Sequence, residues 1–489
     1  MLLLQLVEQH WSTIVLVLLE VLLLVAALLA APRNRQPSAA LAWILVIVAV
    51  PILGLLLFLL IGNPKLPEQR RERQRTMNDR IEQDSDTVEH VVAGPDVPAW
   101  LPAIVRLNRE VGAFPLVDGN RARVLAHHDE QIEALVAMLD SAERYANVEF
   151  YTFALDDATR PVFDALGRAK RRGVAVRVLV DHLGSKKYPG FKPACRELDR
   201  WGIPWRLMLP VQPLRGRYQR PDLRNHRKLV VVDERVALLG SANLIDASYE
   251  RGRHKKPLIW RDLLVEVRGP VVQQVDALFA TDWFSESGEA LATSAVGGVA
   301  DDEDPETVLC QIAPSGPAFE AENNLALFTS LIYAAERRVG ITTPYFVPDP
   351  SLFGAILTAA RRGVEVELFV GAIADQALVL HAQHSYYEAL LDAGVIIQRY
   401  AAPTVLHAKH MTVDDAVTVV GSSNMDIRSF QLDFELTMLV SNRSFTQRIL
   451  AVEDEYRAQS RRLTPEEWSG RAAGHRIADD LARLTSSLQ

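Results

Sequence analysis

Two short strings of residues in this sequence could do chemistry together. The first contains His226 and Lys228, and the second contains His407 and Lys409. Side chains two residues apart on a strand point to the same face, so each string would place an imidazole beside an ammonium group. An imidazole can attack phosphorus or carry a proton, and an ammonium group can hold a phosphate oxygen. This combination suits the chemistry of an anionic phosphodiester.

Both strings continue with the same residue types at the same spacing. Apolar residues follow each lysine, and the strings then reach Asp233 and Asp414. After six further residues each copy has a Gly-Ser-x-Asn segment, whose polar residues are Ser241 and Asn243 in the first copy and Ser422 and Asn424 in the second. Glycine allows a returning backbone to approach closely, and serine and asparagine supply short neutral donors. The matched spacing favours a duplicated site over two unrelated structural histidines.

The strings do not have the composition of a metal site. A divalent cation would need clustered carboxylates or further histidines at ligand spacing, and each His-x-Lys pair places a cation where a second ligand should be. The only cysteines, Cys195 and Cys310, cannot form a disulfide framework or a four-cysteine zinc site. We therefore predict that the chemistry needs no metal and no cofactor. Five histidines outside the strings have no motif partners and are interpreted as structural: His127, His128, His182, His381 and His384.

The elements that must position these residues also occur twice. Residues 169–180 and 359–370 both read as a helix that ends in Arg-Arg-Gly and runs into a β-rich segment, with the glycine placed as a helix C-cap. A further helix follows in each copy and ends at Gly202 or Gly394. Strands that alternate with helices indicate an α/β sandwich in each half.

The first sixty residues read as a membrane anchor. Residues 14–31 and 39–61 are two apolar runs, and the second would be roughly 34 Å long as one helix at about 1.5 Å per residue. A buried soluble hairpin is the alternative. The cations Arg33 and Arg35 precede the second run, and a larger group follows it: Lys65, Arg70, Arg71, Arg73 and Arg75. This bias predicts a multi-pass protein of the cell (inner) membrane with a cytoplasmic catalytic region.

Composition divides the chain into five segments. We expect a two-span membrane anchor (1–67), a juxtamembrane linker (68–98), a first catalytic half (99–284), an inter-half linker (285–306) and a second catalytic half with a C-terminal helix (307–489). In that last helix Ile477, Leu481, Leu484 and Leu488 recur at helical spacing and are expected to pack on the second half. The formal net charge of −8 argues against a protein that coats nucleic acid.

The duplicated strings resemble the HxKxxxxD and GSxN motifs of the phospholipase D superfamily. The resemblance implies two α/β halves related by a pseudo-twofold axis around one active site. It implies a catalytic group of His226, Lys228, Asp233, His407, Lys409 and Asp414, in which the two aspartates complete the motif or support it from behind. It also implies phosphate-binding or orienting places for Ser241, Asn243, Ser422 and Asn424. In this family a downstream carboxylate orients the histidine. Glu435 matches that position in the second half, and Asp262 is the equivalent expected in the first.

The resemblance narrows to the bacterial cardiolipin synthases, which carry two N-terminal spans before a duplicated catalytic region. Four of the matching segments are residues 37–43, 240–249, 342–349 and 421–435. This likeness implies transfer of a phosphatidyl group from one phosphatidylglycerol to another through a phosphohistidine, with release of glycerol. Phosphatidylglycerol and cardiolipin are then the partners, in a membrane-embedded protein that binds no nucleic acid. The sequence leaves the oligomeric state open.

Other functions remain open at this point. The enzyme could pass the phosphatidyl group to water as a phospholipase D, or could use another donor such as phosphatidylethanolamine. A chain of a different class, a catalytically inactive lipid-binding membrane scaffold, would keep the fold without turnover. The sequence also does not decide which histidine is the nucleophile.

Overall fold

The computed structural model describes residues 37–62, 66–85, 97–215, 217–248, 258–294 and 307–484, together with single positions before residue 37. The chain divides into two units. The first covers residues 1–66 and 220–222, and the second covers residues 67–219 and 223–489. The expected first apolar span, residues 14–31, lies outside the described residues apart from a few single positions.

The second apolar run of the first unit forms two helices, α2 (Pro37–Ala49) and α3 (Pro51–Ile61). The expectation of one long helix over residues 39–61 is therefore wrong. Val50 has non-helical dihedral angles and Pro51 begins α3, where its missing N–H costs no helical hydrogen bond. The two helices pack together, with the rings of Trp43 and Phe58 edge to face at 5.4 Å. Within the described part of the chain, no helix has the length and hydropathy needed to span a bilayer.

The second unit is built on one sixteen-stranded mixed sheet. Its strands in the first half are β1 (Val117–Leu125), β2 (Tyr145–Phe150), β3 (Ala175–Asp181), β4 (Trp205–Met208), β8 (Lys228–Val232), β9 (Val236–Gly240) and β11 (Leu264–Arg268). Those of the second half are β12 (Val308–Ser315), β13 (Arg338–Thr342), β15 (Glu365–Gly371), β16 (Ile396–Tyr400), β18 (His410–Val413), β19 (Val417–Gly421), β21 (Asp433–Ser441) and β22 (Ser460–Arg462). The sixteenth strand, β7 (Arg224–Asn225), pairs with β21.

The strand order shows the duplication directly. It runs β4-β3-β2-β8-β9-β11-β1 in the first half and β16-β15-β13-β18-β19-β21-β12 in the second, with β22 added beyond β16. The halves join where β1 pairs antiparallel with β12. Three short strand pairs complete the β-structure: β5 (Val211–Gln212) with β6 (Arg217–Tyr218), β10 (Ile259–Arg261) with β17 (Thr404–Leu406), and β14 (Phe346–Val347) with β20 (Met425–Asp426). The two halves therefore share one sheet around a pseudo-twofold axis between β1 and β12.

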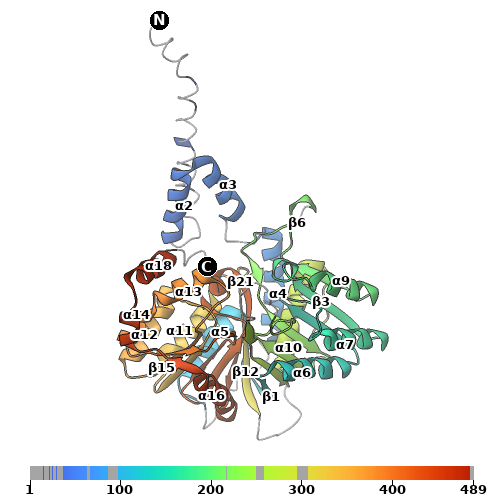
Figure 1. The fold of residues 1–489 in the computed structure, drawn as a ribbon. Helices are drawn as coiled ribbons and strands as arrows, with labels where there is room; N and C mark the ends of the chain where they lie inside the picture. The colour runs from blue at the N-terminus through green and yellow to red at the C-terminus, as the bar shows by residue number, and fades with distance from the viewer. Residues whose placement is uncertain are drawn as a thin grey trace. The chain divides into compact units, whose positions relative to one another are not determined.

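Helices cover this sheet (Figure 1). Those before β12 are α4 (Glu68–Ser85), α5 (Leu101–Gly112), α6 (His128–Asp140), α7 (Arg160–Arg171), α8 (His182–Lys186), α9 (Phe191–Arg200) and α10 (Val271–Ser287), with a short 3₁₀ helix at Pro213–Arg215. Those after it are α11 (Asn323–Ala334), α12 (Pro350–Arg361), α13 (Ala377–His384), α14 (Tyr387–Asp392), α15 (Ile427–Gln431), α16 (Arg443–Ala458), α17 (Pro465–Ser469) and α18 (Ala473–Arg483). In the expected linker region, α4 packs on α10, and Arg70 of α4 forms an ion pair with Glu286.

The Arg-Arg-Gly segments end their helices as the sequence predicts. After α7, Gly173 adopts a φ of +90° and the backbone N–H of Val174 donates to the carbonyl of Ala169. After α12, Gly363 has a φ of +92°, and the matching bond runs from Val364. In each turn the glycine N–H also donates to a carbonyl three residues before it, and the two hydrogen bonds together define the Schellman motif. This motif needs a residue that tolerates positive φ. The glycines thus direct each helix into the next parallel strand.

Three large clusters of buried apolar side chains hold the second unit together. One lies within the first half, a second lies mostly within the second half and includes α5, and the third joins both halves. The shared cluster contains Leu229 and Leu239 from one half, Val420 and Leu436 from the other, and Phe279 of α10. The strands that carry the two motif strings are therefore fixed to one another by a common apolar core.

The C-terminal helix α18 packs on α13 by a face that the sequence did not predict. Its buried residues are Asp479 and Ala482. Ile477, Leu481 and Leu484 are instead 60%, 59% and 78% exposed. The predicted C-terminal helix on the second half is therefore confirmed, but these three apolar residues are not the ones that pack there, and Leu488 lies outside the described residues.

Candidate active site

Each motif histidine is placed by a short strand that pairs with the opposite half. β7, just before His226, pairs parallel with β21 of the second half, and the His226 N–H donates to the carbonyl of Phe434 at 2.8 Å. β17, just before His407, pairs parallel with β10 of the first half, and the His407 N–H donates to the carbonyl of Arg261 at 2.8 Å. Each histidine therefore lies beside a residue of the opposite half. His226 lies beside Glu435, which follows Phe434, and His407 lies beside Asp262, which follows Arg261.

Those next residues are the two carboxylates, so the pairs cross between the halves. Nδ1 of His226 lies 3.0 and 3.2 Å from the two carboxylate oxygens of Glu435. Nδ1 of His407 lies 2.6 Å from Oδ1 of Asp262. A carboxylate at Nδ1 fixes the orientation of the ring and leaves Nε2 available for chemistry. Asp262 and Glu435 thus occupy matching places, although their spacing from the Gly-Ser-x-Asn segments differs.

The serines of the Gly-Ser-x-Asn segments hold these carboxylates. The Ser241 hydroxyl donates to Asp262 at 2.7 Å and accepts from the N–H of Leu263 at 2.9 Å. The Ser422 hydroxyl donates to Glu435 and accepts from the N–H of Leu436 at 2.9 Å. Both serines are buried. Of the two places expected for them, the serines therefore take the orienting one, behind the histidines, where they hold the carboxylates.

The two lysines lie beneath the histidines in matching positions. Nζ of Lys228 donates to the carbonyl of His226 at 2.5 Å, and Nζ of Lys409 donates to the carbonyl of His407 at 2.6 Å. Burial lowers the pKa of Lys228 to about 7 and that of Lys409 to about 8, although nearby carboxylates oppose the shift. The site therefore contains two desolvated cations whose charge depends on pH near neutrality.

A cavity of about 400 Å³ lies over the two histidines. His226, Asn243, His407 and Asn424 line it, but neither lysine is among the described residues that do. The Asn243 side-chain oxygen accepts from the N–H of Thr152 at 3.2 Å. The structure therefore brings four of the residues singled out from the sequence to one surface, with the lysines, serines and carboxylates behind them.

The cavity also contains residues that the sequence reading missed. Tyr151 contacts the ring of His226 edge to face at 5.0 Å, and Trp260 contacts that of His407 at 4.9 Å. Arg428 lines the cavity and pairs with Asp433, whose pKa burial raises to about 6. The available signal was the position of Arg428 in the sequence, between the second Gly-Ser-x-Asn segment and Glu435, which were both expected in the site.

Arg227, between the histidine and the lysine of the first string, is a second missed residue. It is fully buried, and its guanidinium donates to Asp282 of α10 and, at 3.1 Å, to the carbonyl of Glu435. The second string has Ala408 at this position. Arg227 therefore fastens the Glu435 segment to the first half, and the duplication is not chemically exact at this point.

The two histidine–carboxylate pairs differ in their electrostatics. Burial lowers the pKa of His226 well below its ordinary value, and Lys228 and Lys409 add to the shift. Burial raises the pKa of its partner Glu435 well above the usual range. Burial also lowers the pKa of His407, but Asp262 opposes that shift. The pKa of Asp262 is lowered, because His407, Lys409 and Ser241 outweigh its burial. His407 is thus the histidine beside the more firmly ionised carboxylate.

Asp233 and Asp414 lie at the far ends of the motif strands, which agrees with the supporting place that the sequence left open for them. Asp233 accepts hydrogen bonds from the backbone N–H groups of residues 143–145 at 2.7 to 2.8 Å. Asp414 accepts the equivalent bonds from residues 336–338 at 2.7 to 2.9 Å. Both adopt positive φ in the tight turns β8–β9 and β18–β19. We therefore assign them to the start of β2 and β13, and not to the catalytic group.

Replacement of Asp233 by alanine is expected to destabilise the fold by about 3 kcal/mol, because three backbone donors lose their acceptor. Burial alone would raise the pKa of Asp233, but these donors and Arg235 hold it below its ordinary value. The stability that Asp233 contributes is therefore fully present above the pKa that its carboxyl group has in the unfolded chain. This stability disappears as the pH falls through the pKa of the same group in the folded chain. Chemical denaturation of Asp233→Ala and Asp414→Ala tests this. Loss of turnover by folded variants of unchanged stability would restore the catalytic interpretation.

Two α/β repeats that share one sheet, with a histidine from each repeat held by the carboxylate of the other, define a duplicated phospholipase D-type phosphoryl-transfer fold. Comparisons with known proteins place the chain in the same class. A sequence profile described as "Cardiolipin synthase, PLD-like domain" matches residues 135–283 and 328–455, and a phospholipase D-nuclease N-terminal profile matches residues 21–63. The chain therefore belongs to the phospholipase D-like cardiolipin synthase family.

Individual relatives extend this likeness over nearly the whole chain. Cardiolipin synthase A of Yersinia pseudotuberculosis serotype IB (strain PB1/+) is 32% identical over 461 residues, which cover 93% of this chain and 94% of that protein. Cardiolipin synthase A of Yersinia pestis matches to the same extent. The crystal structure of phosphatidylserine synthase of Haemophilus influenzae Rd KW20 superimposes with a TM-score of 0.59 at 16% identity, over 79% of this chain and all of that one. This last likeness concerns the fold alone.

Proposed function

We propose that this protein is a cardiolipin synthase that transfers a phosphatidyl group from one phosphatidylglycerol to another and releases glycerol. The observation that carries the proposal is the pair of histidines that face one cavity, each oriented at Nδ1 by a carboxylate of the opposite half. The near full-length similarity to proteins named cardiolipin synthase A supports the choice of substrate. One phosphodiester of a primary alcohol replaces another, so the exchange needs no nucleotide.

In the first step, Nε2 of His226 attacks the phosphorus of one phosphatidylglycerol and the bond to the glycerol headgroup breaks. The electron pair of that bond goes to the glycerol oxygen, which takes a proton from His407. In the second step, neutral His407 accepts a proton from a headgroup hydroxyl of another phosphatidylglycerol. That oxygen attacks the phosphorus, the bond to His226 breaks, and cardiolipin forms. Covalent catalysis thus divides one difficult displacement into two easier ones.

The assignment of the two roles follows from the carboxylates. A protonated imidazole is favoured beside Asp262, whose pKa is lowered, more than beside Glu435, whose pKa burial raises. His407 is therefore the general acid and His226 the nucleophile. Lys228 and Lys409 supply positive potential to the phosphoryl oxygens from beneath the site.

The pH dependence of kcat/KM for phosphatidylglycerol tests this assignment. Since the pKa of His407 lies below its ordinary value, kcat/KM is expected to begin falling with rising pH below about 6.5. Asp262→Asn removes the charge that stabilises the imidazolium and should move this decline to lower pH by about one unit. Glu435→Gln is the matched control and should move it less. The opposite pattern would exchange the roles of the two histidines.

We also propose that the enzyme is a multi-pass protein of the cell membrane with its catalytic region in the cytoplasm. The apolar runs 14–31 and 39–61 support membrane attachment, and the cations that follow the second run support the orientation. The match of residues 21–63 to an N-terminal profile of related proteins is consistent with an anchor that the family shares. Protease protection of an N-terminal and a C-terminal tag in intact inside-out vesicles would test both statements.

The function itself is tested by product analysis. The full chain is incubated in vesicles with headgroup-labelled phosphatidylglycerol as the only substrate lipid, with EDTA present. Cardiolipin and free glycerol in equal amounts are expected. Phosphatidic acid with free glycerol would instead make the protein a phospholipase D. Turnover only after phosphatidylethanolamine is added would identify that lipid as the donor of the phosphatidyl group. Tight phosphatidylglycerol binding with no turnover of any lipid would favour the scaffold.

A further inference from the structure

The outer face of α18 is an apolar surface on the described catalytic unit. Ile477, Leu481 and Leu484 follow one another at spacings of four and three residues, so they lie on one side of the helix. The buried residues Asp479 and Ala482 lie on the opposite side, against α13. Each of the three apolar side chains is at least 59% exposed. Water-exposed apolar residues in such a stripe mark a surface that another apolar phase covers.

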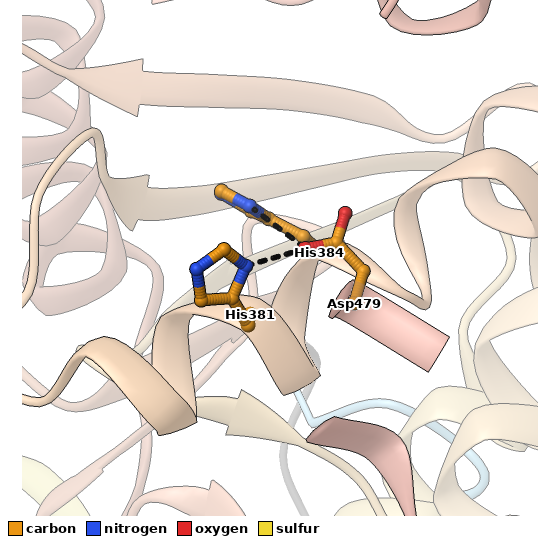
Figure 2. A group of neighbouring side chains, drawn as sticks. All are labelled: His381, His384 and Asp479. Atoms are coloured by element: carbon orange, nitrogen blue, oxygen red, sulfur yellow. Dashed lines mark hydrogen bonds and ion pairs between the residues drawn. The ribbon is translucent and has the colours of Figure 1, made fainter. Parts of the chain in front are cut away.

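A network of polar contacts around Asp479 fixes α18 to α13 (Figure 2). Oδ1 of Asp479 lies 2.7 Å from Nδ1 of His381 and 3.8 Å from Nδ1 of His384, and Arg471 donates to its second oxygen at 2.5 Å. Three ligand atoms at these distances could surround a metal ion. Arg399 and Arg471 both act on His384 electrostatically, however, and two guanidinium cations disfavour a further dication. We therefore interpret the group as a structural contact that holds α18 in one orientation. We call these four residues the latch: His381, His384, Arg471 and Asp479.

The latch connects α18 to the rim of the active site. Leu378 and Val379 at the beginning of α13 line the cavity, and Leu378 is 52% exposed. The cavity of about 400 Å³ cannot hold the four acyl chains of two phosphatidylglycerols, and its lining is rich in polar side chains. The acyl chains must therefore remain outside while the headgroups react. An apolar surface fixed to the helix at the rim suits this requirement.

We propose that the Ile477, Leu481 and Leu484 face of α18 inserts into the surface of the anionic bilayer that supplies the substrate, and so holds the cavity mouth at the headgroup level. This proposal rests on the proposed function for the identity of the lipid. The exposed charged residues on α18 are Arg476, Asp480 and Arg483, so one net positive charge flanks the apolar face. An apolar face opposite a polar one is typical of helices that lie in the membrane interface, and the net positive charge favours an anionic surface.

Site-specific fluorescence tests the insertion without relying on turnover. An environment-sensitive dye is attached to Leu481→Cys of the full chain, reconstituted in phosphatidylglycerol vesicles that contain a lipid with a nitroxide on its acyl chain. Burial raises the pKa of Cys195 to about 12 and also raises that of Cys310, so the native thiols stay protonated and the new exposed cysteine reacts first. The matched control carries the dye at Glu133→Cys, on the exposed face of α6.

The expected result is a blue-shifted, nitroxide-quenched dye at position 481 and an unshifted, unquenched dye at position 133. Equal quenching at the two positions, or none at 481, would overturn the proposal even if the protein makes cardiolipin. The variant Ile477→Glu/Leu481→Glu is expected to lower cardiolipin formation from vesicles about tenfold. Its turnover of a soluble short-chain phosphatidylglycerol should stay within about twofold of wild type. An equal loss with both substrates would also contradict the proposal.

Discussion

Replacement of His226 by alanine is expected to lower cardiolipin formation by a factor on the order of 10⁴ or more, because the covalent route through Nε2 is removed. His407→Ala should cause a comparable loss with phosphatidylglycerol, since glycerol then leaves without a proton. The two variants should differ with a phosphatidyl ester of a nitrophenol, whose leaving group needs no general acid. His407→Ala should recover a first-turnover burst of about one nitrophenol per enzyme, and His226→Ala should not.

The burst of nitrophenol in the first turnover, followed by absorbance, separates these outcomes, because the second step still needs His407 as the base. His128→Ala is a suitable control, because His128 lies at the beginning of α6 and not among the residues that line the cavity. Recovery by His226→Ala in place of His407→Ala would reverse the two roles. Full activity of either variant toward phosphatidylglycerol would remove that histidine from the mechanism.

Lys228→Met and Lys409→Met are expected to lower kcat/KM by roughly 10² to 10³, because each removes a desolvated positive charge beneath the phosphoryl group. The pKa values of about 7 for Lys228 and about 8 for Lys409 also make substrate binding by the wild-type enzyme depend on pH. Both lysines are charged below these values, so phosphatidylglycerol binding should weaken as the pH rises through them. KM measured between pH 6 and 9 in vesicles tests this.

Lys192→Met, at an exposed position of α9, is the matched control for loss of one lysine and should leave kcat/KM and its pH dependence unchanged. A Lys228→Met variant whose KM keeps the pH dependence of the wild type, with only a small loss of rate, would show that this lysine serves the fold alone. The same comparison applies separately to Lys409.

Much of the fold could be predicted because local rules decide it. The Arg-Arg-Gly segments give Schellman turns before β3 and β15, where Gly173 and Gly363 adopt positive φ. The matched strings also predicted the two histidines that face one cavity. The crossing of the carboxylates could not be predicted. It depends on β7 and β17, strands of two and three residues that pair with the opposite half and have no pattern of their own.

The contacts of the polar motif residues could not be predicted from the sequence either. Motif spacing identifies Ser241 and Ser422 but does not say that their hydroxyls point to Asp262 and Glu435. It likewise could not distinguish Asp233, which caps the start of β2, from the residues at the other end of β8. Which of these groups faces the substrate follows from the sheet register, and the register is set by the shared core.

Apolar periodicity predicted a C-terminal helix but not its orientation. The stripe through Ile477 and Leu481 was expected to pack on the second half, whereas the helix is held by Asp479 on the other side. Burial of a paired carboxylate was favourable here because His381 and Arg471 both reach it. A stripe of apolar residues therefore identifies an amphipathic helix without telling whether protein or lipid covers it.

The central claim is that one phosphatidyl group passes through His226 while His407, oriented by Asp262, carries the proton. Rapid acid-free quenching of the wild type with phosphatidylglycerol, followed by mass spectrometry of the digested protein, tests it most directly. The account predicts a phosphatidyl adduct on the peptide that contains His226, formed within one turnover and absent in His226→Ala. An adduct on the His407 peptide, or cardiolipin formation at full rate with no adduct on either peptide, would contradict it.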